Sequence, residues 1–252
     1  IPGSLVGSEM CIRDRVSVPE QNWALFLEKI NQLKELKDIQ IKKALQEGIS
    51  FYKLTIKVRK EIVAYGLLEN DYDIDIVGKH LNSEEFNSAL DNPKTIVVDI
   101  RNYYESEVGH FKNAIIPNVE TSKKLLPEVK KILRGKEEDK ILLYCTGGIR
   151  CEKASSYLIK NGFKDINQLR GGIIQYAHDM KEKKTASKFK GKNFVFDNRL
   201  GERVTEDVIS KCHICQEPCD NHTDCKNDSC HILFIQCTKC EKKFMGCCSD
   251  EC

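Results

Sequence analysis

Short apolar runs alternate with amphipathic stretches across the middle of the chain. Residues 96–100 (Ile-Val-Val-Asp-Ile) and 141–144 (Ile-Leu-Leu-Tyr) are nearly continuous apolar runs, as is typical of strands buried on both faces of a parallel sheet. The full pattern predicts strands at residues 96–100, 141–144 and 166–169 and helices at 125–133, 152–161 and 171–180. This alternation predicts an α/β fold with a doubly wound parallel sheet.

The segment before this region, residues 16–66, has a different pattern. Its large apolar residues from Trp23 to Leu36 follow helical spacing. Further on, Leu54, Ile56 and Val58 alternate with polar and basic residues, as in a half-buried strand. We therefore predict part of a small module with helices and strands. The basic face of that strand suits either RNA or solvent, and solvent is the favoured alternative.

Three further segments lack a core pattern. Residues 67–90 are expected to form a polar connector that ends in a short helix, with Asn82 and Glu85 spaced as a capping box. Residues 181–192 are a lysine-rich linker of the kind that is usually solvated. Residues 1–15 show neither periodicity nor the architecture of a secretory signal, and we expect them to be a non-native segment.

Charge and hydropathy narrow the possible partners. The formal net charge is +2, so no global field indicates a polyanionic partner, although local basic stretches still allow RNA binding. The sequence has no run of eighteen or more apolar residues, so we expect no membrane-spanning segment.

A cysteine loop follows the second apolar run directly. In a parallel sheet the carboxyl ends of the strands face the ligand crevice, and glycines let successive N–H groups point at one centre. Together with the N-terminus of the next helix, such amides lower the pKa of a thiol and favour the thiolate. We predict Cys145 as a nucleophile and Arg150 as a forked donor to an incoming oxyanion. The loop consists of Cys145, Thr146, Gly147, Gly148, Ile149 and Arg150.

The spacing between Cys145 and Arg150 distinguishes two chemistries. Four residues intervene, whereas cysteine phosphatases use five to cradle a phosphate. The tighter ring is typical of rhodaneses and suits a persulfide sulfur. The alternative is an inert buried cysteine, which the position between a strand and a helix disfavours. A catalytic role requires a sulfur that solvent reaches and amides that are turned toward it.

Further motifs surround this loop in a defined order. They are Asp99-Ile100-Arg101, Glu105, residues 109–114 (Gly-His-Phe-Lys-Asn-Ala), Gly162-Phe163 and residues 169–172 (Leu-Arg-Gly-Gly). With the cysteine loop they resemble the signature of the rhodanese family over about residues 91–185. The resemblance implies that Asp99 and Arg101 lie at a strand end and support the loop through an ion pair.

A narrower resemblance rests on four segments. Residues 108–111, 144–154, 191–197 and 225–228 are similar to those of the bacterial tRNA uridine hydroxylases, a rhodanese-related family. This resemblance implies three parts, namely a partial ferredoxin-like (acylphosphatase-like) module at 16–66, a rhodanese domain at 91–185 and a cysteine-rich extension at 186–252. The first half of the N-terminal module and the family's basic tail are then expected to be missing.

The same resemblance implies oxygen-dependent hydroxylation at C5 of the wobble uridine of tRNA. Dioxygen is then a co-substrate, tRNA and a sulfur donor protein are partners, and the cytoplasm is the expected location. We find no flavin or nicotinamide motif of the Gly-x-Gly-x-x-Gly type. Cys145 acts either as a covalent nucleophile or as a sulfur or redox carrier. Cys151 either resolves an oxidised Cys145 through a disulfide or simply fills a small buried position.

Cysteine usage sets the end of the chain apart, since ten of the 13 cysteines lie in residues 212–252. Two Cys-x-x-Cys pairs separated by 21 residues resemble a zinc ribbon, and we predict a structural zinc held by Cys212, Cys215, Cys237 and Cys240. A disulfide framework or an iron–sulfur cluster is the less favoured alternative. A second site with unassigned ligands is possible among Cys219, His222, Cys225, Cys230, His231, Cys247, Cys248 and Cys252.

Two other functions compete with tRNA hydroxylation. A plain sulfurtransferase passes persulfide sulfur to a thiol or tRNA acceptor and uses Cys145 in the same position. A non-catalytic zinc-binding scaffold docks RNA or protein and does not need Cys145 at all. The intact Cys–Arg loop disfavours the scaffold.

Overall fold

The computed structural model describes residues 18–37, 41, 63, 65–119, 121–196 and 199–252 and divides the chain into two compact units. The first unit spans residues 1–62 with 197–199. Its described part contains η1 (Glu20–Asn22), α1 (Trp23–Gln32) and η2 (Lys34–Leu36). The helix predicted from the spacing of Trp23 to Leu36 is therefore present. The strand expected around Leu54–Val58, most of the expected ferredoxin-like module and residues 1–15 lie outside the described residues.

The second unit, residues 63–196 with 200–252, is built on a four-stranded parallel sheet. The strands lie in the order β1 (Lys79–Leu81), β5 (Asp165–Leu169), β4 (Lys140–Tyr144) and β2 (Ile96–Asp99). The pairing of β2 with β4 places Val97 opposite Leu142 and Asp99 opposite Tyr144. The carboxyl ends of β2 and β4 therefore meet at one edge, so that Arg101, two residues after β2, and Cys145, the residue after β4, lie at the same edge.

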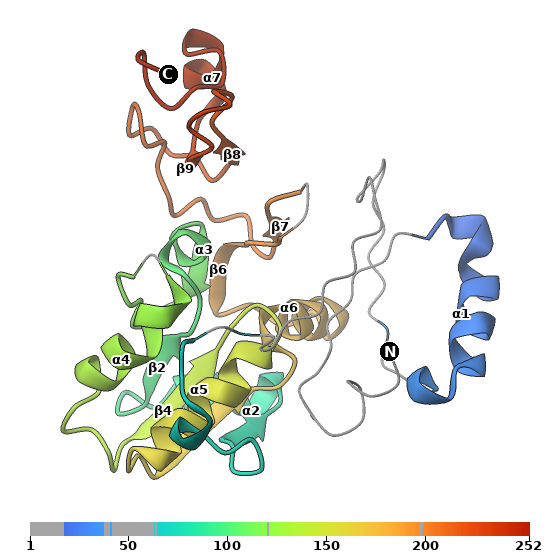
Figure 1. Cartoon of the computed structure of the whole chain (residues 1–252), viewed down its shortest axis with the longest axis vertical. Coiled ribbons are helices and arrows are strands. Elements are labelled where there is room, and N and C mark those ends of the chain that lie inside the picture. The colour runs from blue at the N-terminus through green and yellow to red at the C-terminus, as the bar shows by residue number, and fades with distance from the viewer. Residues whose placement is uncertain (1–17, 38–40, 42–62, 64, 120, 197–198) are drawn as a thin grey trace. The chain divides into compact units, whose positions relative to one another are not determined.

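Helices cover both faces of this sheet (Figure 1). In β4, Ile141 and Leu143 pack into one apolar cluster with α4 (Ser122–Ile132) and α5 (Ile149–Lys160). Leu142 and Tyr144 point the other way, toward α2 (Ser83–Leu90) and α6 (Gly172–Glu182). Because successive strand residues face opposite sides, an unbroken apolar run is what a doubly covered strand needs. The predicted doubly wound parallel sheet is confirmed.

A second, antiparallel sheet was not predicted. It joins β3 (Gly109–Phe111), β6 (Phe189–Asn193) and β7 (Glu202–Arg203), and β3 follows the short helix α3 (Tyr103–Glu107). Gly109 pairs with Gly191, and a Cβ atom on Gly109 would lie 2.1 Å from the carbonyl oxygen of Lys192. Backbones this close tolerate only glycine.

The largest differences between the observed elements and the sequence expectations concern residues 67–90, the lysine-rich linker and the start of α5. The segment 67–90, expected as a connector, holds η3 (Glu69–Asp71) and the edge strand β1 as well as α2 with its Asn82–Glu85 capping box. The lysine-rich linker ends in β6, whose residues Phe189 and Gly191 are buried opposite Phe111 and Gly109 of β3. The helix expected from residue 152 begins at Ile149, because Gly148, with φ 97°, turns the chain there.

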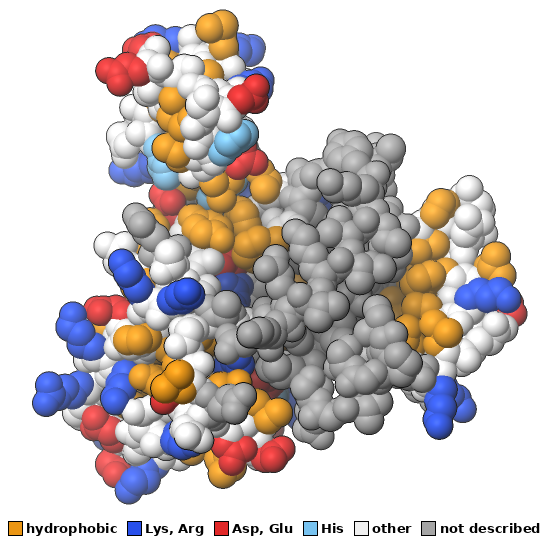
Figure 2. All heavy atoms as spheres, viewed as in Figure 1, with side chains coloured by type: hydrophobic (Ala, Val, Ile, Leu, Met, Phe, Trp, Pro, Cys, Tyr) orange, Lys and Arg blue, Asp and Glu red, His pale blue; other side chains and the backbone are white. Residues whose placement is uncertain are grey.

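The cysteine-rich extension forms a small hairpin, β8 (His222–Asp224) with β9 (Leu233–Ile235), followed by α7 (Thr238–Lys243). Its buried residues Cys212, Cys219, Ile235 and Cys240 share one apolar cluster with Val108 and Phe194. The cysteine-rich part of the extension thus packs against Val108, the residue after α3, and against Phe194, the residue after β6. Figure 2 shows charged side chains of both signs interspersed on the face of the sheet domain in view. In the described part of the chain, none of the helices is long and apolar enough to cross a bilayer.

Candidate active site

The Cys145 loop connects the end of β4 at Tyr144 to the start of α5 at Ile149. The amide of Gly148 donates a hydrogen bond to Cys145 Sγ at 3.1 Å, and the amide of Gly147 also faces the sulfur. Burial by itself raises the pKa of Cys145, but a hydrogen bond from Cys151, the charge of Arg150 and these two amides outweigh it and bring the pKa to about 5. Cys145 is therefore a thiolate at neutral pH.

Glu105 occupies the fork of Arg150. Arg150 Nη1 lies 2.5 Å from Glu105 Oε1, and Nη2 lies 2.7 Å from Oε2. The carboxylate is fully buried, and Thr146 Oγ1 donates a further hydrogen bond to it at 3.2 Å. We expected Arg150 to present this fork to an incoming oxyanion, but a bidentate carboxylate already satisfies both of its terminal nitrogens.

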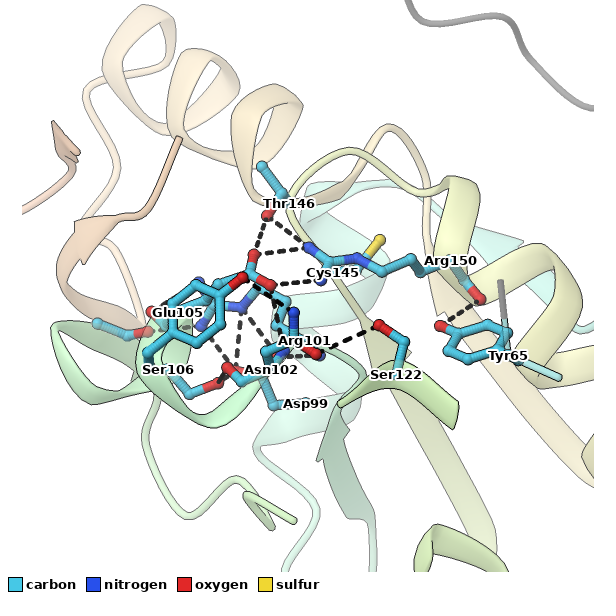
Figure 3. A network of polar contacts seen from close by, with 12 residues as sticks. Tyr65, Asp99, Arg101, Asn102, Glu105, Ser106, Ser122, Cys145, Thr146 and Arg150 are labelled. Atoms are coloured by element: carbon cyan, nitrogen blue, oxygen red, sulfur yellow. Dashed lines mark hydrogen bonds and ion pairs between the residues drawn. The ribbon is translucent and has the colours of Figure 1, made fainter. Parts of the chain in front are cut away.

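Asp99 and Arg101 form a buried ion pair with each other at 2.6 Å, and both side chains are fully excluded from solvent. Arg101 also donates to the carbonyl oxygens of Glu105 at 3.3 Å and Gly109 at 2.6 Å. These bonds hold the turn of α3 that carries Glu105. The pair therefore contacts the Cys145 loop through Glu105 and Arg150, as Figure 3 shows.

The N-terminus of α6 holds the loop from the other side. The amide of Ile173 donates to the carbonyl oxygen of Cys145 at 3.0 Å, and the amide of Ile174 donates to the carbonyl oxygen of Thr146 at 3.1 Å. Gly172 allows this approach, since a Cβ atom there would lie 2.5 Å from the Cys145 carbonyl oxygen and its φ is +65°. The second glycine of the Leu-Arg-Gly-Gly motif is thus needed because a larger residue would collide with the Cys145 loop.

Cys151 follows Arg150 directly, in the first turn of α5, and is completely buried. Burial and the adjacent Cys145 thiolate hold the pKa of Cys151 well above its ordinary value, so this residue is a thiol that donates to the thiolate. Both cysteines are free. The structure therefore places the Cys151 thiol next to the Cys145 thiolate, where a cysteine that resolves an oxidised Cys145 would have to lie.

The Cys145 residue is only 1% exposed. Its amides are turned toward the sulfur as expected, but the expectation of a sulfur that solvent reaches is not met in this conformation. Tyr65 is also 1% exposed, belongs to the same apolar cluster and donates its hydroxyl to the carbonyl oxygen of Arg150 at 3.3 Å. The burial of Cys145 thus disfavours a catalytic role in this conformation, and such a role requires that neighbouring side chains move to expose the sulfur.

Sequence reasoning gave no role to Glu105 or Tyr65. Glu105 stood in the rhodanese-like motif and was quoted only as part of it. The signal that a buried acidic partner was needed was Arg150 itself, because an arginine next to a packed strand end requires a counter-charge. Tyr65 lies near the end of residues 16–66, which we assigned to the N-terminal module, and nothing in its sequence context indicated a place beside the Cys145 loop.

The four predicted zinc ligands come together in the extension. The sulfur atoms of Cys212, Cys215, Cys237 and Cys240 all lie within 4.8 Å of one another, and the Cys215–Cys237 separation is 3.6 Å. Tetrahedral zinc with Zn–S bonds of about 2.3 Å requires sulfur atoms about 3.8 Å apart. The amide of Cys237 donates to Cys212 Sγ at 3.4 Å. The donor set and its spacing fit a tetrathiolate zinc ion.

Comparisons with known proteins cover nearly the whole chain. Residues 82–179 match the rhodanese-like domain and residues 190–252 match the family described as rhodanase C-terminal. The chain is also similar to a solved rhodanese-related protein from Thermoplasma volcanium, with 25% identity and a TM-score of 0.34, over 40% of this chain and 92% of that one.

Two curated relatives carry the same name. The tRNA uridine(34) hydroxylase of Leptospira interrogans is 51% identical over 96% of this chain, and that of Escherichia fergusonii is 46% identical over 96%. The chain spans about two thirds of the length of these relatives, 66% of the first and 69% of the second. With this identity, and with both domain matches in the family's order, the chain belongs to the tRNA uridine(34) hydroxylase family.

Proposed function

We propose that this chain hydroxylates uridine 34 of tRNA at C5, with Cys145 as the covalent nucleophile. The observation that carries the proposal is the thiolate at the end of β4, which accepts hydrogen bonds from two amides and from Cys151. Family membership supplies the substrate. The rhodanese domain at residues 91–185 holds the reacting group, and the extension at 186–252 packs against it.

The proposed role of the thiolate follows from the electronics of the uracil ring. C6 is electrophilic because it is conjugated with the C4 carbonyl, so Cys145 Sγ adds there and the C5–C6 π pair moves toward C5 and the C4 oxygen. The electron-rich C5 then bonds to one oxygen atom of dioxygen, and reductive cleavage of the O–O bond leaves a hydroxyl group on C5 while the other oxygen atom leaves as water. Loss of the C5 proton and cleavage of the C6–S bond restore the aromatic ring and the free thiolate.

The overall reaction also needs a reductant. Insertion of one oxygen atom into the C5–H bond, with the other released as water, consumes two electrons and two protons. We assign these to a thiol reductant that is oxidised to a disulfide. Dioxygen and this reductant are the two co-substrates of the proposal.

The charges around Cys145 favour a neutral substrate group. The thiolate, Glu105 and Asp99 are anionic, whereas Arg150 and Arg101 are cationic, and the two arginines are already paired with the carboxylates. An inorganic dianion such as thiosulfate would meet net negative charge at a site with low dielectric constant. A nucleobase carries no charge and avoids this repulsion. The arrangement therefore supports a uridine substrate over a small anionic sulfur donor.

We further propose that Cys212, Cys215, Cys237 and Cys240 bind a structural zinc. Cys212 and Cys240 lie in the apolar cluster with Val108, the residue that follows α3. His213 Nε2 also lies 2.7 Å from Glu107 Oε1 on that helix. The ion would keep the extension folded against the helix that presents Glu105 to Arg150. We also propose a cytoplasmic location, where a tRNA substrate would be met.

Nucleoside mass spectrometry of tRNA tests the function. Cells that lack the gene should lose 5-hydroxyuridine and its derivatives, the wild-type gene should restore them, and Cys145→Ser should not. Loss of 2-thiouridine instead would identify a sulfurtransferase. Full complementation by Cys145→Ser would identify a scaffold.

A trapping experiment tests the covalent step separately. A tRNA with 5-fluorouridine at position 34 cannot lose a proton from C5, so the adduct at C6 should persist in denaturant. We expect a stable complex with wild-type protein and none with Cys145→Ser. Hydroxylation of normal tRNA without any trapped complex would show that Cys145 acts as a sulfur or redox carrier.

A further inference from the structure

A second cluster of four cysteines lies in the extension, apart from the predicted zinc ligands. The sulfur atoms of Cys225, Cys230, Cys248 and Cys252 all lie within 4.8 Å of one another. Two of the separations are 3.7 Å for Cys230–Cys248 and 3.5 Å for Cys248–Cys252. None of these cysteines forms a disulfide, in which the sulfur atoms would be about 2.05 Å apart.

These distances match a metal site. Four thiolates around one zinc ion lie about 3.8 Å from each other, since each Zn–S bond is about 2.3 Å. The amides of Asn227 and Cys248 also face the sulfur of Cys225, so that backbone donors offset part of the negative charge of the ligands. An all-sulfur tetrahedral set selects zinc or iron over magnesium, calcium or manganese.

We propose that Cys225, Cys230, Cys248 and Cys252 bind a second zinc ion, so that the extension holds two. The spacing in the sequence did not identify this site, because four residues separate its first pair and three its second. The other residues of the broader set have different surroundings. Cys219 is buried in the apolar cluster with Val108, and the ring of His222 packs edge-on against Phe194 with a centroid separation of 5.0 Å.

The order of the ligands interleaves the two sites. The first site takes residues 212 and 215, the second 225 and 230, the first again 237 and 240, and the second 248 and 252. Each ion therefore closes a loop that contains a ligand pair of the other. The hairpin β8–β9 and the six-residue helix α7 supply few buried apolar residues of their own. In so small a core, the two ions are expected to provide most of the folding free energy, and loss of either loosens both.

Native mass spectrometry of the full chain tests the proposal. The wild-type protein should carry two zinc ions, and Cys248→Ser should carry fewer. Cys247→Ser is the matched control, because Cys247 is the adjacent cysteine and belongs to neither four-cysteine cluster, even though its thiol contacts Cys225. It should keep two ions. One zinc in wild type, an equal loss in both variants, or bound iron would overturn the proposal.

A measurement on the wild-type protein covers the case in which Cys248→Ser fails to fold. Zinc released by a thiol-modifying mercurial, and detected with a colorimetric chelator, should amount to two ions per chain. Replacement by cobalt should then give sulfur-to-cobalt charge-transfer bands with twice the intensity of a single tetrathiolate site. One released ion, or a single-site cobalt spectrum, would refute the second site without bearing on tRNA hydroxylation.

Discussion

Glu105 holds both terminal nitrogens of Arg150 from a helix that lies 45 residues earlier in the chain. This pair decides what the loop can bind. An arginine that is free to rotate would draw anions to the sulfur, whereas an arginine fixed by a buried carboxylate acts on the thiolate mainly through its charge. The pKa of Cys145 is accordingly lowered while the fork stays occupied.

We predict that Glu105→Gln destabilises the protein by about 3 kcal/mol, because it leaves a largely buried guanidinium without its counter-charge. Urea unfolding measures the change. Glu128→Gln is the control, since Glu128 pairs with Lys131 on the surface of α4 and its loss should cost less than about 1 kcal/mol. Equal costs for the two variants would show that the Glu105–Arg150 pair contributes no more than a surface pair.

The low pKa of Cys145 predicts a pH-dependent contribution to stability. The pKa is about 5 in the folded protein against 9.0 for an ordinary thiol. A group with a depressed pKa stabilises the fold fully above its ordinary pKa, and this contribution falls as the pH drops from about 9 to about 5. The difference in unfolding free energy between wild type and Cys145→Ser should therefore shrink over this range. A difference that does not vary with pH would show that Cys145 is an ordinary thiol.

We predict that Cys151 contributes to the low pKa of Cys145. Cys151→Ala removes a hydrogen bond to the thiolate and should raise the pKa of Cys145 by about one unit. Cys151→Ser keeps a donor at the same position and should restore most of the shift. The thiolate absorbance in the ultraviolet, taken as the difference from Cys145→Ser, reports the titration. No change in Cys151→Ala would leave Cys151 as a buried space-filling residue.

The central sheet was readable from sequence because its strands are buried on both faces, which leaves unbroken apolar runs such as residues 141–144. The strands β1 and β6 could not be predicted from the sequence. Three residues that include Lys79 and His80 carry too little pattern, and β6 contains two lysines and depends on pairing with Gly109. Such strands are determined by their partners rather than by their own residues.

In the candidate site, too, some features follow from the local sequence and others depend on the tertiary structure. The loop and its amides follow from local sequence, since Gly147 and Gly148 stand next to Cys145. The partner of Arg150 does not, because only the parallel pairing of β2 with β4 brings Glu105 near it. In the extension, the two Cys-x-x-Cys pairs indicated one site, whereas the irregular spacing of the second cluster concealed which cysteines converge.

Gly172→Ala should disrupt the active loop. The new methyl group would lie 2.5 Å from the Cys145 carbonyl oxygen, so either α6 or the loop must move. We expect loss of 5-hydroxyuridine formation and a lower melting temperature. Gly135→Ala is the control, because its φ is also positive, at +80°, but nothing lies within 4 Å of the added atom. That variant should lose about 1 kcal/mol through backbone strain and keep its activity. Unchanged activity in Gly172→Ala would show that the loop tolerates displacement.

Zinc removal should unfold the extension before the sheet domain. Metal ions are expected to supply most of the stability of residues 205–252, whereas the sheet has two apolar clusters of its own. A strong chelator should therefore make the extension sensitive to limited proteolysis, while a fragment that contains β1 to α6 stays resistant. Mass spectrometry of the fragments locates the cuts, and added zinc should restore protection. Simultaneous digestion of both parts would mean that the sheet domain depends on the ions as well, through the packing of Cys212 and Cys240 against Val108.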